Sequence, residues 1–158
     1  FQGKYDEAEP LYERSQAIRE KVLGPEHPDV AISLDNRAGF LSIYADPLYV
    51  RVLEILGATV GEEHPNYAST LNNRALKHDL LTLPTYIQGK YDEAGPLYER
   101  SLAIREKAYG PDHPAVATAL NNRAGLLKAQ GKYEEAEPLY ERSQAIREKV
   151  LGPQHPDV

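Results

Sequence analysis

Apolar and small residues between positions 113 and 151 recur at three- and four-residue spacing in two runs. The first run is Val116, Leu120, Ala124 and Leu127, and the second is Tyr133, Ala136, Tyr140, Ser143, Ile146 and Val150. This spacing places each run on one face of an α-helix. Gly131 separates the two runs, and Gly152 and Pro153 end the second. The pattern therefore predicts two amphipathic helices joined by a short turn.

The same pattern recurs along the chain. The tripeptide Pro-Leu-Tyr begins at Pro10, Pro47, Pro96 and Pro138, and a His-Pro pair follows each copy 17 residues later. Both markers advance by 37, 49 and 42 residues. A period of roughly 20 to 50 residues is typical of solenoids, whose repeats bury their apolar faces against one another. We predict an all-α, right-handed superhelical solenoid of antiparallel helix pairs, with about seven helices.

The markers also divide the chain into the units of a single repeat array. These are an orphan second helix at 1–23, repeats at 28–59, 64–109 and 113–151, and the start of another repeat at 155–158. The chain has no Met, and both ends fall inside a repeat, so we expect a fragment of a longer array. The proline of each Pro-Leu-Tyr copy falls within a second helix, where proline removes a hydrogen bond. We expect those helices to start late or to bend there.

Two repeats depart in length from the regular unit. Five residues are missing between Leu41 and Pro47, so the first of these repeats has a shortened turn. Seven residues are added between Asn73 and Gly89. The addition predicts an inserted loop at 77–87, which is either part of a binding face or a lengthened connector.

The helix predicted at 47–60 has lost its polar face. Its residues Val50, Val52, Leu53 and Leu56 stand where the first copy has Glu13, Ser15, Gln16 and Arg19. An apolar outer face indicates an outer contact patch, covered by a partner, a second chain or the inserted loop. The alternative interpretation is an error in the sequence between residues 40 and 88.

Charge and composition narrow the class of partner. The chain has 24 acidic and 18 basic side chains and a net charge of −6, whereas nucleic-acid-binding proteins usually present a basic face. We therefore expect no nucleic acid among its partners. The chain has no Cys and shows neither an apolar run long enough for a membrane span nor a signal peptide. We expect no membrane insertion and a cytoplasmic location.

Motifs of catalysis and metal binding are missing from the sequence. It has no glycine-rich phosphate loop, no Gly-x-Ser-x-Gly and no His-Glu-x-x-His. The repeated histidines come one per repeat, each before a proline, whereas a metal site requires several converging ligands. We expect no enzymatic activity, no metal and no cofactor, and we interpret the histidines as turn residues.

Two segments of the third repeat resemble the tetratricopeptide repeat. They are Leu-Asn-Asn-Arg-Ala-Gly-Leu-Leu at 120–127 and Gln-Gly-Lys-Tyr-Glu-Glu-Ala-Glu-Pro-Leu-Tyr at 130–140. The signature positions are Leu120, Ala124, Gly131, Tyr133, Ala136 and Tyr140. With its 42-residue spacing, the chain is similar to the arrays of kinesin light chains and to related arrays fused to nucleotide-binding signalling proteins. The resemblance implies a solenoid that binds other proteins.

The resemblance also implies a ligand-facing concave wall on the first helix of each repeat. Its positions lie one, five and eight residues after the signature leucine. They are Asp35, Gly39 and Ser42, then Asn72, Leu76 and Asp79, and finally Asn121, Gly125 and Lys128. Asparagine amides offer both donors and an acceptor to an extended peptide backbone, and the glycines leave room for ligand side chains. Lys128 favours an acidic peptide, whereas the two aspartates oppose one.

One departure from the family pattern concerns arginine. Arg37, Arg74 and Arg123 stand in the first helices where the family usually has leucine. A buried guanidinium needs a partner or a path to solvent. The three arginines therefore either pair with Glu or stack on Tyr of a neighbouring helix, or form a ladder of cations that reaches the ligand groove.

Three functions follow as hypotheses. The first is a non-catalytic protein-protein interaction module, or scaffold, that binds a peptide or partner segment in its concave groove. The second is a structural or oligomerisation segment that joins a larger assembly, or a second copy, through the apolar helix at 47–60. The third is the sensor arm of a nucleotide-binding signalling protein, whose chemistry lies in another part of that protein.

Overall fold

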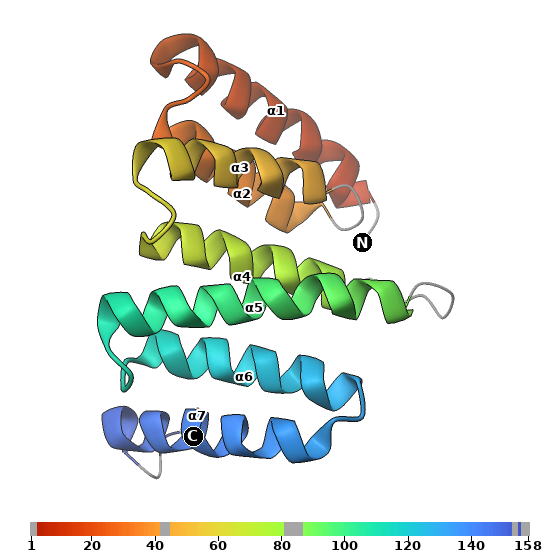
Figure 1. Cartoon of the computed structure of the whole chain (residues 1–158). Helices are drawn as coiled ribbons and strands as arrows, with labels where there is room; N and C mark the ends of the chain where they lie inside the picture. The colour runs from red at the N-terminus through yellow and green to blue at the C-terminus, as the bar shows by residue number, and fades with distance from the viewer. Residues whose placement is uncertain (1–2, 42–44, 81–86, 153–154, 156–158) are drawn as a thin grey trace. The chain divides into compact units, whose positions relative to one another are not determined.

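A computed structural model describes residues 3–41, 45–80, 87–152 and 155 of the chain. Within these ranges the chain forms seven α-helices and no strand (Figure 1). They are α1 (Gly3–Leu23), α2 (Pro28–Phe40), α3 (Asp46–Thr59), α4 (Pro65–Leu80), α5 (Ile87–Tyr109), α6 (Pro114–Ala129) and α7 (Tyr133–Leu151). The predicted all-α class is confirmed, and the handedness of the superhelix stays a prediction.

The helices group into two compact units. The first unit, Phe1–Glu62, holds α1 to α3, and the second, Glu63–Val158, holds α4 to α7. In the first unit α2 packs against both α1 and α3. In the second unit each helix packs against the next along the chain, and α4 also contacts α6. Consecutive helices within a unit run in opposite directions (Figure 1).

Each first helix of a pair begins at a His-Pro pair. In His27, His64 and His113 the ring Nδ1 accepts a hydrogen bond from the backbone N–H two residues later, at 3.1 Å in all three. The prolines that follow occupy the first helical position, where a missing N–H costs nothing. The histidines are therefore N-caps, which satisfy a backbone donor that the helix leaves unpaired.

Glycines with left-handed backbone conformation follow the second helices. They are Gly24, Gly61, Gly110 and Gly152, with φ values of 91°, 91°, 86° and 88°. This conformation is unfavourable for residues that carry a Cβ atom, so glycine is the usual residue after a helix end of this type. Gly24, Gly61 and Gly110 lie in the turns that lead to α2, α4 and α6.

The prolines of Pro-Leu-Tyr do not delay the helices that contain them. Pro10, Pro96 and Pro138 lie inside α1, α5 and α7, and α7 begins five residues before its proline, at Tyr133. The expected late start is wrong for these helices, because packing of the apolar face outweighs the lost hydrogen bond. In α3 the five residues missing before Pro47 shorten the segment that leads to the proline. Pro47 therefore lies in the first turn of the helix, where proline is tolerated.

The inserted segment is shorter as a loop than the sequence indicated. Helix α4 continues to Leu80 and α5 already begins at Ile87, so residues 77–80 and 87 of the expected loop are helical. Residues 81–86 lie outside the described residues. Lys77 and His78 form the last turn of α4, where basic side chains favour the helix dipole, and this explains the extension.

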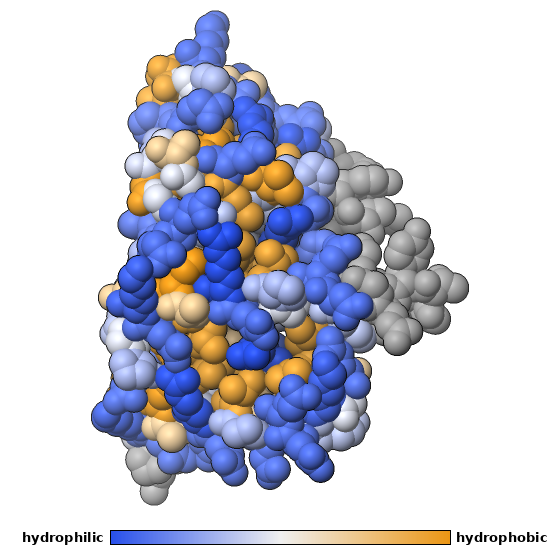
Figure 2. Space-filling model, in the orientation of Figure 1, coloured by the Kyte–Doolittle hydropathy of each residue, from blue (hydrophilic) through white to orange (hydrophobic). Residues whose placement is uncertain are grey.

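The core of the second unit lies between successive helices. Val116, Leu120 and Ile146 are at most 4% exposed and pack together across α6 and α7. Buried Tyr98 of α5 packs with Leu126 of α6 in a neighbouring cluster. Figure 2 shows apolar side chains in the seams between helices and hydrophilic ones along the exposed helix surfaces.

The outer side of α7 differs from the sequence expectation. Tyr133 and Val150 belong to the apolar pattern, but they are 66% and 50% exposed. The buried part of the pattern, such as Ala136, Ser143 and Ile146, faces α6. Helix α7 is the last helix of the described chain, so no further helix packs on its outer side there.

In two helix hairpins, an exposed ion pair joins the end of the second helix to the turn that precedes the first helix. Lys107 of α5 pairs with Glu63 at 2.7 Å, and Lys149 of α7 pairs with Asp112. The lysine ammonium groups lower the pKa of the Glu63 and Asp112 carboxyls below their usual values. Because all four side chains are exposed, each pair contributes little to stability.

Candidate functional site

The predicted concave residues of the second unit lie on one face of α6 and on α4. On α6, Asn121 and Gly125 are half-buried and Lys128 is exposed. On α4, Leu76 is half-buried and packs against the core. The side chain of Asp79, at the end of α4, is outside the described part of the chain.

In the first unit two of the three predicted concave residues are described. Asp35 is half-buried and Gly39 exposed, and both lie on α2. Ser42, the third, lies outside the described residues. Of the three predicted positions, α2 therefore contributes one acidic residue, Asp35, and one glycine, Gly39.

Asn72 has a role within the fold. Its side chain is 5% exposed, and its Oδ1 accepts a hydrogen bond of 3.0 Å from Nδ2 of Asn122 on α6. This bond ties the first helices of two neighbouring repeats together. Asn121, at the position equivalent to Asn72, makes no side-chain hydrogen bond within the described ranges, so its amide remains available to a ligand.

The two predicted concave glycines are not required by helix packing. A Cβ atom on Gly125 would lie 3.7 Å from the Tyr140 hydroxyl, which is an ordinary contact, and one on Gly39 would meet nothing within 4 Å. A glycine inside a helix costs about 0.5 to 1 kcal/mol relative to alanine. Both glycines thus leave open space on a first helix that the fold itself does not use.

Two of the three ladder arginines bind carboxylates of the preceding second helix. Arg37 of α2 donates to Glu9 at 2.5 and 2.8 Å and to Glu13 at 2.6 Å, both on α1. Arg123 of α6 donates to Glu99 of α5 at 2.7 Å. Arg74 is half-buried on α4. For Arg37 and Arg123 the contacts correspond to pairing with Glu, the first of the two alternatives.

The expected outer contact patch on α3 is not exposed. Val52, Leu53 and Leu56 retain 1%, 9% and 5% of their accessible surface, and Val50 alone of the four is exposed, at 37%. Helix α3 is therefore apolar because most of that face is buried within the chain. This corrects the expectation that all four residues form an outer surface.

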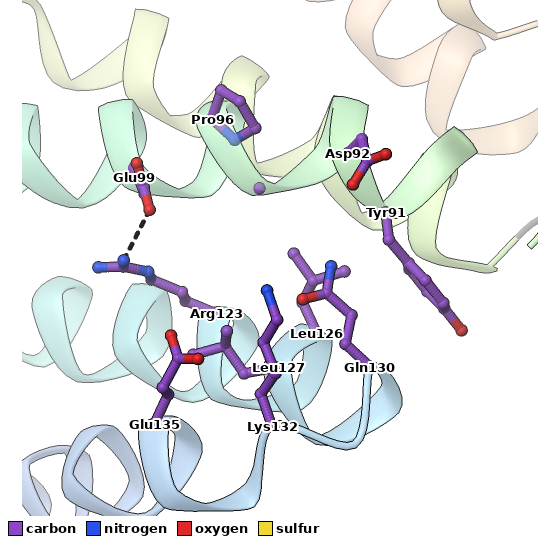
Figure 3. A pocket seen from close by; sticks show the side chains of 11 residues that line it. Tyr91, Asp92, Pro96, Glu99, Arg123, Leu126, Leu127, Gln130, Lys132 and Glu135 are labelled. Carbon is purple, nitrogen blue, oxygen red and sulfur yellow. Dashed lines mark hydrogen bonds and ion pairs between the residues drawn. The ribbon is translucent and has the colours of Figure 1, made fainter. Parts of the chain in front are cut away.

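A pocket of about 230 Å³ lies between α5, α6 and the start of α7 (Figure 3). Its basic side chains are Arg123 and Lys132, and its acidic ones are Asp92, Glu99 and Glu135. Tyr91, Leu126 and Leu127 give it apolar walls, and Gly95 lies on its α5 side. This pocket was not predicted, although the sequence carries a signal at Gly95. In the other three copies an acidic residue, Glu9, Asp46 or Glu137, precedes the proline.

The described residues also bear on metal binding and membrane insertion. No group of three or more His, Asp or Glu side chains is arranged there to hold a metal ion. None of the described helices combines the length and the apolar character that crossing a bilayer requires.

Comparison with known proteins adds to this geometry. The family model of the tetratricopeptide repeat matches residues 1–40, 85–149 and 116–158. The fold is similar to BtubC (BKLC) from P. vanneervenii, with 25% sequence identity and a TM-score of 0.79 over 98% of this chain. The chain spans 60% of that protein's length. A search of curated proteins finds no match.

A second solved structure is a putative kinesin light chain from Podosopora anserina, with nearly identical TPR-like repeats. It shares 24% sequence identity with this chain and has a TM-score of 0.45, covering 94% of this chain and 90% of its own.

Proposed function

Because the chain belongs to the tetratricopeptide repeat family, we propose that it is a non-catalytic protein-protein interaction module that binds a partner segment along its first helices. The observation that carries this proposal is the face of α6 formed by Asn121, Gly125 and Lys128. It combines an amide that bonds to no described side chain or backbone group, a glycine that packing does not require and an exposed cation.

The chemistry of this face suits an extended peptide. The Asn121 amide can donate to a backbone carbonyl and accept from a backbone N–H, so it fixes a strand-like segment without demanding one sequence. The space above Gly125 admits a ligand side chain. Lys128 adds attraction for an acidic residue, which is modest because the ammonium is exposed to solvent.

The other two functions receive less support. Oligomerisation through α3 would need an exposed apolar face, and three of the four residues of that face are buried. A sensor arm of a nucleotide-binding signalling protein stays a prediction that depends on flanking sequence. A location in the cytoplasm likewise stays a prediction.

The proposal is tested with a peptide selected on the protein itself. A random peptide library displayed on phage is panned against the chain, and a fluorescein-labelled copy of an enriched peptide is titrated by fluorescence anisotropy. In the double variant Asn121→Ala, Lys128→Glu we expect binding at least tenfold weaker. Lys21→Glu, which reverses an exposed charge on α1, is the matched control and should bind as the wild type does. Failure to enrich any peptide, or equal affinity of the double variant, would contradict the proposal.

A further inference from the structure

The two arginines Arg37 and Arg123 occupy equivalent positions but have different surroundings. Arg37 uses all three of its guanidinium nitrogens, donating to Glu9, Glu13 and Gln16 of α1. Arg123 donates only from Nη2, to Glu99. Its Nε and Nη1 have no hydrogen-bond acceptor in the described part of the chain. The difference lies in the second helix that precedes each arginine.

The repeat in the sequence explains why Arg123 has fewer hydrogen-bond partners than Arg37. Arg37 and its three partners recur 86 residues later as Arg123, Gly95, Glu99 and Leu102. Glu99 is retained, Gln16 is replaced by a leucine that is buried in the core, and Glu9 is replaced by glycine. Arg123 therefore retains one of three partner side chains.

Replacement of the glutamate by Gly95 creates the space of the pocket. A Cβ atom on Gly95 would meet its nearest heavy atom, Cδ2 of Leu126, at 3.9 Å, an ordinary van der Waals distance. The helices therefore do not need a glycine there to approach each other. A glycine inside a helix is unfavourable, so this residue costs stability while it opens the pocket in front of Arg123.

The open space has the chemistry of a carboxylate site. The Arg123 side chain is 30% exposed, against 18% for Arg37, so its unused donors are within reach of a ligand. A guanidinium presents its donors in a planar fork that matches a carboxylate. The Lys132 side chain extends toward the same space in Figure 3 and makes no ion pair with any described residue. Leu126 and Leu127 would contact the methylene groups of an entering side chain.

We propose that this pocket binds the side chain of a glutamate from a partner protein, whose carboxylate takes on Arg123 the place that Glu9 takes on Arg37. The occupant is inferred from the chain itself. In the first unit a glutamate fills the equivalent space and accepts hydrogen bonds from Nε and Nη2 of the arginine.

The acidic residues of the pocket do not exclude a second carboxylate. Arg37 binds the carboxylates of Glu9 and Glu13 together, so one guanidinium at this position accommodates two. Asp92 and Glu135 oppose an entering anion, and the Lys132 ammonium offsets part of that repulsion. The site therefore selects a single carboxylate side chain and disfavours a run of acidic residues.

The pocket is separate from the proposed peptide groove. A helix turns once in about 3.6 residues, so Arg123, Leu126, Leu127 and Gln130 fall on one side of α6. Asn121, Gly125 and Lys128 fall on the opposite side. A partner that places a glutamate in the pocket therefore approaches from the other face of this helix, and the inference does not depend on the groove.

The test uses N-acetyl-L-glutamate α-methylamide, whose only carboxylate is its side chain, with the neutral glutamine analogue as the matched control. Each compound is titrated into the isotope-labelled chain, and the NMR signals of the Arg123 Nε–H and the Gly95 amide are followed. We expect a saturable shift with the glutamate compound and none with the glutamine compound. Equal shifts with both compounds, or no saturable shift, would overturn the proposal.

Three variants make the assignment specific. Gly95→Glu supplies the carboxylate from within the chain and should abolish the Arg123 response. Gly95→Ala removes the glycine but leaves the pocket open, and should keep the response. Glu9→Gly opens the equivalent space in the first unit and should make the Arg37 Nε–H respond, which it does not do in the wild type. Persistence of the Arg123 Nε–H response in Gly95→Glu would overturn the proposal, and so would persistence of the Gly95 amide response in a further variant, Arg123→Gln, because either would place binding elsewhere.

Discussion

At the residue scale, the histidine before each helix-starting proline is an N-cap, whereas the sequence alone indicated only a turn residue. The ring accepts a hydrogen bond at Nδ1 in His27, His64 and His113, so a neutral ring carries its proton on Nε2. An imidazole here replaces the Ser, Thr, Asp or Asn that usually caps a helix. Residue preferences alone do not indicate this cap, because histidine is not among the common N-cap residues.

His64 provides the clearest test of the cap, because His113 also stacks on Tyr109. His64→Ala should lower the free energy of unfolding by about 1 kcal/mol, since it leaves the Asn66 N–H without its acceptor. His64→Asn, which restores a capping oxygen, should recover most of the loss. Urea denaturation measures the change, and hydrogen exchange of the Asn66 amide locates it. Equal stability of the alanine and asparagine variants would argue against capping.

Asn72 and Asn121 show why single site residues are hard to predict. Each follows the signature leucine of its repeat, so the sequence treats them as equivalent. Asn72 is buried because the first helix of the next repeat, α6, supplies the Asn122 amide as its partner. No described first helix follows α6, and Asn121 remains partly exposed. The environment of a repeated residue depends on its neighbours as well as on its position in the repeat.

At the scale of elements, α5 is hydrogen-bonded to the first helix on either side of it, and α1 and α7 each make one of the same two kinds of contact. Ser101 and Ser143 donate to backbone carbonyls of the first helix of their own pair, at 2.7 and 2.8 Å. Arg19 and Arg105 donate instead to carbonyls in the first turn of the next first helix, at 3.1 and 3.0 Å. Two short polar contacts thus set the position of a second helix between its neighbours.

The serine contact leads to a prediction with an internal control. Ser143→Ala removes a buried hydrogen bond to the Ala117 carbonyl, and should lower the free energy of unfolding by about 0.5 to 1.5 kcal/mol. Ser15 has the same place in the first copy of the repeat but is exposed on α1, so Ser15→Ala should change stability little. Both are measured by urea denaturation. Equal losses in the two variants would contradict a stabilising role for the Ser143 hydrogen bond.

The order and type of the helices could be predicted from the sequence, and some of their ends could not. Apolar periodicity and the His-Pro and Gly markers locate α2, α6 and α7 well, because these signals are local. The continuation of α4 to Leu80 was missed, and of the two alternatives given for Pro138, a late helix start and a bend, the late start was wrong. The first follows from the basic residues in the last turn of α4, and the second depends on tertiary packing, which overrides the preference of a single residue. The burial of α3 was missed for the same reason.

At the scale of the whole molecule, the two candidate binding surfaces differ in how far the sequence predicts them. The groove face follows from the family resemblance, because the same helix positions recur in each repeat. The Arg123 pocket depends on a difference between repeats, the change of Glu9 to Gly95. In the sequence alone, that change is one substitution among several. The structure shows its consequence, because Glu9 binds Arg37 and Gly95 cannot bind Arg123 in the same way.

The location of both surfaces on α6 predicts that they bind their ligands independently. Gly95→Glu should block the Arg123 pocket yet leave the affinity for a groove-selected peptide within about twofold of wild type, because changes that share no contact have nearly additive effects. Conversely, Asn121→Ala with Lys128→Glu should weaken that peptide and preserve the Arg123 response to the glutamate compound. Anisotropy and NMR titrations on the same set of variants measure the two effects, and the variant with all three changes should lose both. Loss of peptide affinity in Gly95→Glu alone would instead indicate one continuous binding surface around α6.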